Sequence, residues 1–183
     1  EIKDSGSEEE ISLKATYLDT EDMDLCKKKM AFRVRLENGS PIATLKWGGG
    51  ATDGLHVRGE LNVPVEDSYV ESPRIDIFKG SEIYEDIKLA VGDKPLRPIM
   101  EMECLRKQMA VDTGKSISVV SLDIGNILTD RGTAPIAELE IELYSGDKDD
   151  MVALGRELAA KYNLVPENKS KFQRGLELMG MIE

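Results

Sequence analysis

The chain has 183 residues, of which 40% are hydrophobic and 32% are charged, a balance typical of a single soluble globular domain over residues 1–183. Its formal net charge of −11 argues against binding to nucleic acid or to an anionic membrane surface, since both are negatively charged. Two cysteines far apart in sequence, Cys26 and Cys104, favour a reduced, cytoplasmic protein over a disulfide scaffold. Because the overall charge is negative, any anionic ligand must be held by a local cluster of basic residues.

The first part of the chain is predicted to be mainly β-strand. Alternating and β-branched segments predict strands at Ile11–Leu18, Ala31–Glu37, Pro41–Trp47 and Leu55–Val65. Asn38-Gly39 is a hairpin-turn signal between the second and third of these strands. The glycine run at 48–50 predicts a flexible loop, and the spacing of apolar residues predicts a helical segment from Ser72 to Val91.

The second part of the chain is predicted to contain three more strands followed by two helices. The strands are expected at about Met100–Val111, Ser116–Leu122 and Ala137–Tyr144. The apolar periodicity over Asp147–Tyr162 predicts an amphipathic helix. Asn168 or Ser170 is expected to cap a final short helix that runs to Leu178.

Charged and apolar residues alternate on several of the predicted strands. Because successive side chains of a strand point to opposite faces, charged residues two positions apart share a face. The sets that share a face are Arg33 with Arg35, Thr44 with Lys46, Arg58 with Glu60, and Glu138 with Glu140 and Glu142. Alternation by itself fits equally well an open sheet with one solvent-exposed face and no site.

The three glutamates of the last predicted strand are unusual, because neighbours on one face are only about 7 Å apart and repel one another. Their arrangement becomes favourable when a divalent cation or basic side chains lie among them. Mg²⁺ and Mn²⁺ prefer carboxylate oxygens, while arginine and lysine suit phosphate oxygens. The two kinds of strand together predict a metal–polyphosphate site. If the sheet closes, both halves face one lumen and the apolar positions face covering helices.

Six short motifs follow one another over nearly the whole chain. They are Tyr17-Leu18-Asp19-Thr20, Arg33-Val34-Arg35, Thr44-Leu45-Lys46, Arg58-Gly59-Glu60, Arg106, and Glu138-Leu139-Glu140-Ile141-Glu142. In this order they resemble the CYTH superfamily, or triphosphate tunnel metalloenzymes. The segment Asn168-Lys169-Ser170-Lys171 with Arg174-Gly175 is similar to the bacterial inorganic triphosphatase branch. The resemblance implies an α+β fold in which eight antiparallel strands form a closed or nearly closed β-barrel, or tunnel, with flanking helices.

The resemblance also implies a hydrolase that removes the terminal phosphate of inorganic triphosphate or a related organic triphosphate, using Mg²⁺ or Mn²⁺. The residues that would bind the small-molecule triphosphate are Lys3, Arg33, Arg35, Lys46, Arg58 and Arg106. The residues that would hold the metal are Glu1, Glu138, Glu140 and Glu142. Lys3 and Glu140 would be catalytic, and Glu60 and Asp123 would orient the basic residues.

The family's first strand reads E-x-E-x-K, whereas this chain shows only Glu1-Ile2-Lys3, without the first glutamate. That departure keeps three alternatives open: a thiamine triphosphatase, a class IV adenylyl cyclase, and a non-catalytic polyphosphate-binding module. Lys171 and Arg174 are weaker candidates for the site, because basic residues near helix ends commonly have structural roles. The physiological substrate, the metal preference and the oligomeric state do not follow from the sequence.

Overall fold

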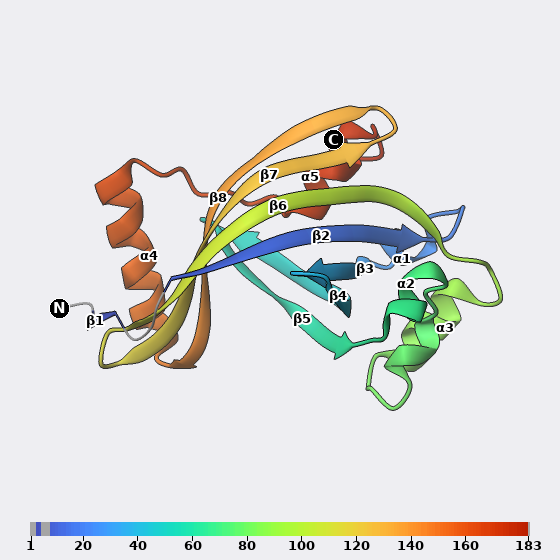
Figure 1. The fold of residues 1–183 in the computed structure, drawn as a ribbon, viewed down its shortest axis with the longest axis horizontal. Helices are drawn as coiled ribbons and strands as arrows, with labels where there is room; N and C mark the ends of the chain where they lie inside the picture. The colour runs from blue at the N-terminus through green and yellow to red at the C-terminus, as the bar shows by residue number, and fades with distance from the viewer. Residues whose placement is uncertain (1–2, 5–7, 183) are drawn as a thin grey trace.

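Within residues 3–4 and 8–182, which the computed structural model describes, seven strands form a continuous antiparallel sheet in the order β5-β4-β3-β2-β6-β7-β8. The strands are β2 (Glu9–Asp19), β3 (Met30–Glu37), β4 (Ser40–Thr52), β5 (Leu55–Pro64), β6 (Arg97–Asp112), β7 (Ser116–Thr129) and β8 (Gly132–Gly146). The two-residue strand β1 (Lys3–Asp4) pairs with the end of β6. Figure 1 shows that the sheet curls into a half-barrel, with helices on its flanks.

The helices are α1 (Asp24–Lys27), α2 (Asp67–Glu71), η1 (Ile75–Phe78), α3 (Tyr84–Val91), α4 (Lys148–Tyr162) and α5 (Lys171–Leu178). The last two confirm the predicted C-terminal helices. Asp147 caps α4, and Ser170 forms a capping box with Gln173 at the start of α5. The predicted helix over 72–91 is interrupted, because Gly80 has a φ of +88° and separates η1 from α3. No helix among the described residues is long and apolar enough to cross a membrane.

The predicted turn at Asn38-Gly39 joins β3 and β4, with φ values of 48° and 90° at the two residues, as a two-residue hairpin turn requires. The glycine run at 48–50, in contrast, lies inside β4 rather than in a loop. The register of β4 against β5 shifts between Trp47 and Gly50, which marks a β-bulge. Gly49 has a φ of +88° there, and a Cβ at that position would collide with the backbone of Val57.

The two edges of the sheet, β5 and β8, are not paired with each other in the described part of the chain. The segment between α4 and α5 instead reaches the β4–β5 hairpin. The amide of Gly54 donates to Asn168 Oδ1 at 2.9 Å, and His56 Nε2 is hydrogen bonded to the carbonyl oxygen of Glu167 at 2.9 Å. The predicted antiparallel sheet with flanking helices is confirmed, but the closed or nearly closed eight-stranded barrel is not.

Two apolar cores lie on opposite faces of the sheet. The outer core joins β3 and β4 to α1, η1 and α3 around Phe32, Leu45 and Phe78. The inner core lies on the concave face, where Tyr17 and Met100 belong to the same cluster as residues of α5. Those residues are Phe172 and Leu176 of α5 and Met179, which directly follows the helix. Gly175 lets α5 lie close to the sheet, since a Cβ there would overlap the sulfur of Met100.

The outer face of β6 and β7 departs from the expectation that helices cover every apolar position. Leu105 is 42% exposed, Leu122 is 42% exposed and Ile124 is 53% exposed. The helices α1, η1 and α3 cover β3 and β4 instead, and α4 packs against β7 and β8 through Met151 and Leu154. These three residues form an apolar strip that stays exposed, because the outer surface of the half-barrel is larger than the area that its helices cover.

Candidate functional site

The strand register gathers the predicted charged residues on the concave face. Side chains of directly opposed residues in an antiparallel pair lie on the same face. The opposed pairs are Tyr17 with Arg33, Arg33 with Thr44, Lys46 with Glu60, Arg106 with Asp123, Asp123 with Glu138, and Ser121 with Glu140. The curl brings the ends of the sheet toward one another, so that the charge of Lys46 on β4 contributes to lowering the pKa of Glu140 on β8.

Two arginines on β3, Arg33, which is buried, and Arg35, which is half-buried, form the basic side of this face. Arg33 is 7% exposed, and its Nη1 donates to the Tyr17 hydroxyl at 3.4 Å. The Arg35 guanidinium forms an ion pair with Glu37. Within the described part of the chain, the Nε of each arginine is buried without a hydrogen-bond partner. Because buried polar groups are normally paired, these two N–H donors are available to an acceptor from outside the described residues.

Lys46 stands beside the arginines and is held by a chain of polar contacts. Its Nζ lies 2.9 Å from Glu60 Oε2, and Asn62 links Glu60 to Thr44 through hydrogen bonds of 3.1 and 2.7 Å. Burial and the charges of Arg33 and Arg58 lower the pKa of Lys46 to about 7, against the opposing effect of Glu60. An anion bound here would raise that pKa again. Glu60 thus contacts Lys46 directly.

Arg106 joins the basic and acidic sides of the face. Its Nε and Nη2 each lie 2.7 Å from an oxygen of Asp123, a two-pronged ion pair, and Nη2 also lies 2.6 Å from Glu140 Oε2. Asp123 is fully buried. Burial opposes the charged form of Arg106, but the hydrogen bond with Asp123 and the charge of Glu140 raise its pKa above the usual value. Asp123 therefore holds the Arg106 guanidinium through two contacts.

Lys171, from the first turn of α5, lies at the centre of the acidic side. Its Nζ is 2.6 Å from Glu140 Oε1, 2.7 Å from Glu138 Oε2 and 3.0 Å from Asp123 Oδ2, and its side chain is only 9% exposed. Arg174, one turn further along α5, forms an ion pair with the other oxygen of Glu138. Burial would raise the pKa of Glu140, but Lys171 and Arg106 lower it to about 2.

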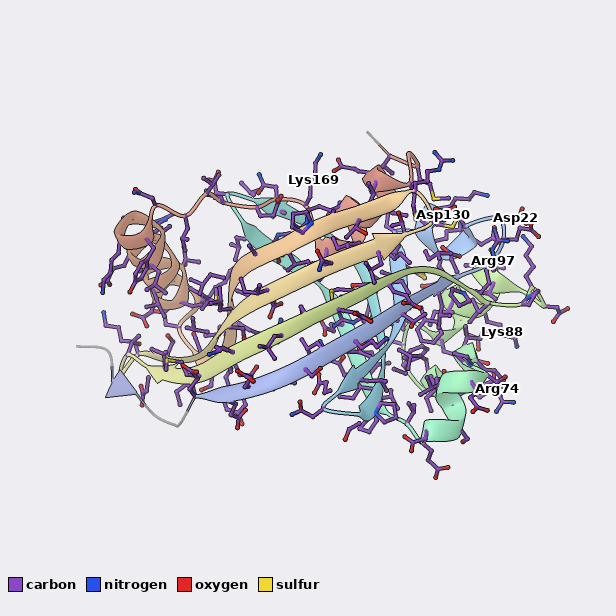
Figure 2. The ribbon with its side chains drawn as sticks, turned by 45° about the horizontal axis from the view of Figure 1, so that its top comes forward. Asp22, Arg74, Lys88, Arg97, Asp130 and Lys169 are labelled. Atoms are coloured by element: carbon purple, nitrogen blue, oxygen red, sulfur yellow. The ribbon has the colours of Figure 1, made fainter. Side chains whose placement is uncertain are left out.

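These two α5 residues are the part of the site that sequence reasoning underestimated. Their spacing of three places them on one side of a helix, and that spacing was the signal available in the sequence. Lys169, two residues before Lys171, pairs with Glu177 on α5 and lies at the surface (Figure 2). The site thus uses one of two neighbouring lysines.

The other predicted residues lie at various distances from this cluster. Arg58 is exposed on β5, near the rim. The backbone of Lys3 pairs with that of Asp112, six residues along β6 from Arg106 and so roughly 20 Å away. That separation concerns the backbone of Lys3, and Glu1 lies outside the described residues.

The predicted metal ligands were compared with what a divalent cation requires. Carboxylate oxygens are the right donors for Mg²⁺ or Mn²⁺. The oxygens of Glu138 and Glu140, however, surround the Lys171 ammonium, and Glu142 is exposed further along the strand. Among the described residues, no three aspartate, glutamate, histidine or cysteine side chains are arranged to hold a metal ion. In this arrangement the acidic cluster does not fit a bound divalent cation.

A cleft of about 350 Å³ opens on the concave face beside the cluster, and it is within the size range of small-molecule sites. Its walls include Arg35, Glu37, Arg106, Gln108 and Glu142. The cleft lies between the half-buried Arg35 of β3 and Glu142 of the acidic strand β8.

Comparison with known sequences gives a family and a relative. The model of the CYTH domain family matches residues 3–176. An inorganic triphosphatase from Haemophilus influenzae is 31% identical over 160 residues, which cover 87% of this chain and 44% of that protein. The chain therefore spans less than half the length of this relative.

Several solved structures have a similar fold. A candidate adenylyl cyclase from Hippeastrum, described as having a dominant triphosphatase activity, superposes with a TM-score of 0.67 at 15% identity, over 96% of this chain and 85% of that one. A candidate adenylate cyclase from Bacillus halodurans gives a TM-score of 0.58 at 18% identity, over 90% and 82% of the two chains. At these identities the similarity shows the fold alone.

Proposed function

This chain belongs to the CYTH domain family, and we propose that it is a phosphohydrolase that cleaves the terminal phosphate of inorganic triphosphate or a related organic triphosphate. The observation that carries the proposal is the pair of buried Nε–H donors on Arg33 and Arg35, which have no partner within the described residues. A chain of phosphate oxygens would supply acceptors for both. The inorganic triphosphatase to which the chain is 31% identical supports the same substrate class.

Phosphoryl transfer depends mainly on alignment and charge stabilisation, and the concave face offers both. Arg33, Arg35 and Lys46 would bind phosphate oxygens, with Arg58 at the rim. The two-pronged contact with Asp123 holds the Arg106 guanidinium at the boundary between the arginines and the acidic strand. Arg106 would contact the phosphate nearest that strand.

Glu140 would act as a carboxylate. Lys171 and Arg106 keep its pKa near 2 against the effect of burial, so it is ionised at neutral pH and cannot donate a proton. It can accept a hydrogen bond from an attacking water and orient it. This is the role we propose for Glu140 as a catalytic residue.

Dependence on Mg²⁺ or Mn²⁺ is part of the proposal. A divalent cation would neutralise phosphate charge when bound. Glu138 and Glu140 are the ligands we propose, and they would have to release their present basic partners. We also propose that the curled sheet encloses the extended triphosphate as a tunnel would, with the β4–β5 hairpin and the segment before α5 joining its two edges.

The test is phosphate release from tripolyphosphate, ATP and thiamine triphosphate, each with Mg²⁺, Mn²⁺ or EDTA. We expect metal-dependent release that is strongest with tripolyphosphate and is lost in Glu140→Ala. Lys169→Ala, which changes a surface lysine near the same helix, is the control and should retain activity. Absence of release from all three compounds would contradict the proposal. Formation of cyclic AMP from ATP would instead identify a cyclase.

A further inference from the structure

The Lys171 ammonium lies at the point on which the three carboxylates of the acidic side converge. Each of Asp123, Glu138 and Glu140 places an oxygen within 3.0 Å of Nζ. An ammonium has three N–H donors and no acceptor, so the three carboxylates match it one for one. A compact cation surrounded by carboxylate oxygens is also the surrounding that a divalent metal ion requires.

The charges around this point are already balanced. The three carboxylates contact three cationic side chains: Lys171, Arg174 and Arg106. A metal ion that entered while Lys171 stayed in place would bring two cations within a few ångströms of each other, where the side chains of Lys171 and Asp123 are buried although that of Glu140 is partly exposed. The ammonium and a divalent cation therefore exclude one another.

We propose that Lys171 is a resident counter-ion that a divalent cation must displace, so that one set of carboxylates alternates between an ammonium-bound and a metal-bound state. The proposal rests on the metal dependence in the proposed function. It resolves the disagreement between a donor set suited to Mg²⁺ or Mn²⁺ and a geometry that is closed around a lysine.

The packing of α5 allows this exchange without movement of the helix. Phe172, Leu176 and Met179 anchor α5 in the inner core, and Ser170 caps its first turn. Lys171 belongs to that first turn, and its long side chain can leave the carboxylates by rotation. Because Arg106 shares Glu140 with Lys171, a cation bound at Glu140 would also free one N–H donor of Arg106 for phosphate.

The experiment measures Mn²⁺ binding in the absence of any phosphate compound, from the loss of the free-ion electron paramagnetic resonance signal. It uses the wild type, Lys171→Met, Lys171→Gln and the control Lys169→Ala. Both Lys171 variants should bind Mn²⁺ on the order of tenfold more tightly than the wild type, since groups next to metal ligands alter affinity by about this factor. The control should match the wild type, and adding Glu140→Ala to either Lys171 variant should remove the gain.

No gain in Mn²⁺ affinity in the Lys171 variants would overturn the inference, and so would a gain that survives Glu140→Ala. If Lys171→Met does not fold without its buried cation, Lys171→Gln decides the outcome, because its amide still donates to the carboxylates. A wild type that hydrolyses triphosphate with Mn²⁺, beside Lys171 variants with unchanged Mn²⁺ affinity, would refute the counter-ion and leave the proposed function intact. Tighter Mn²⁺ binding in those variants, with no hydrolysis by the wild type, would support the counter-ion and refute the function.

Discussion

Arg33 and Arg35 of β3 keep Nε–H donors without a partner in the described residues, whereas Glu138 and Glu140 of β8, across the concave face, form ion pairs through all four of their carboxylate oxygens. Both sets lie on strands of one curled sheet and arise from the same alternation in the sequence. They differ in what approaches them. A terminal helix supplies cations to β8, while nothing in the described chain supplies an acceptor to the Nε of either arginine on β3.

The arginine side and the carboxylate side of the concave face therefore have different roles. The arginine side is left incomplete and so is prepared for an anionic ligand, at some cost in stability, because an unpaired buried polar group is unfavourable. The carboxylate side is neutralised internally and contributes to holding the fold together. Variants on each side of the concave face test this contrast between the arginines and the carboxylates.

Removing Asp123 should produce the largest loss of stability. Asp123→Ala leaves Arg106 without its two-pronged partner and Lys171 without one of three contacts, so the free energy of unfolding should fall by about 3 kcal/mol, as when a buried ion pair is broken. Urea denaturation measures the change. The matched control is Asp130→Ala, an exposed aspartate at the far end of the same strand's hairpin, which should change little (Figure 2). Equal stability of the two variants would mean that the acidic side does not support the fold.

Removing Arg33 should have the opposite pattern. Arg33→Met keeps similar bulk but takes away a buried charge with an open donor, so stability should stay the same or rise. Tripolyphosphate affinity should fall by roughly 100-fold, because hydrogen bonds to charged groups and the local charge are lost together. Calorimetric titration gives the affinity and urea denaturation the stability. An Arg33→Met variant that is less stable than the wild type but still binds tripolyphosphate would contradict the contrast between the arginine side and the carboxylate side.

The lowered pKa of Lys46 predicts a smaller, pH-dependent effect. With a pKa of about 7, set by burial and by Arg33 and Arg58, Lys46 loses its proton as the pH rises through neutrality, and its attraction for an anion weakens. In the ligand-free protein the sign is opposite: the unfolded lysine holds its proton to a higher pH, so stability rises with pH above about 7.

Tripolyphosphate affinity measured from pH 6 to 8.5 should therefore fall several-fold more in the wild type than in Lys46→Arg, because arginine stays charged throughout. Using the same ligand with both proteins cancels the titration of tripolyphosphate itself. Identical pH profiles would show that Lys46 is charged over the whole range or does not contact the ligand.

The smallest expected effect concerns the cap of α5. Ser170→Ala removes the hydroxyl that accepts a hydrogen bond from the backbone N–H of Gln173, at a cost of about 1 kcal/mol in stability. The loosened first turn carries Lys171, so Mn²⁺ affinity should rise slightly while tripolyphosphate affinity in the absence of metal stays the same. Ser170→Asp, which can still cap the helix, should restore the wild-type stability. Equal changes in Mn²⁺ affinity and in tripolyphosphate affinity would mean that α5 does not act selectively on the carboxylates.

The sequence was sufficient to predict which face each charged residue occupies, because strand alternation is a local property. Arg33 with Arg35 and Glu138 with Glu140 share the concave face as expected. It was also sufficient for the Asn38-Gly39 turn and for the capped terminal helix, since both depend on a few adjacent residues.

The contacts that decide the state of the site were not predictable in the same way. Lys171 meets Glu140 across 31 positions of sequence, and only the docking of α5 brings the two together. The gap between β5 and β8 likewise depends on how strongly the whole sheet curls, which no single strand encodes. Local patterns therefore placed the charges on a face but did not identify their partners.

The position of α5 against the sheet gives a residue without a side chain an unexpected part in this chemistry. Gly175 sits where a Cβ would overlap the sulfur of Met100, so a larger residue there would require the Met100 side chain or the helix to shift. Lys171 lies one turn earlier on the same helix, so the distance of its ammonium from the carboxylates depends on how close α5 lies to the sheet. If an added methyl group at 175 moves α5 rather than the Met100 side chain, Lys171 moves relative to the carboxylates, and a steric change within the apolar core alters the ion pairs of the acidic strand.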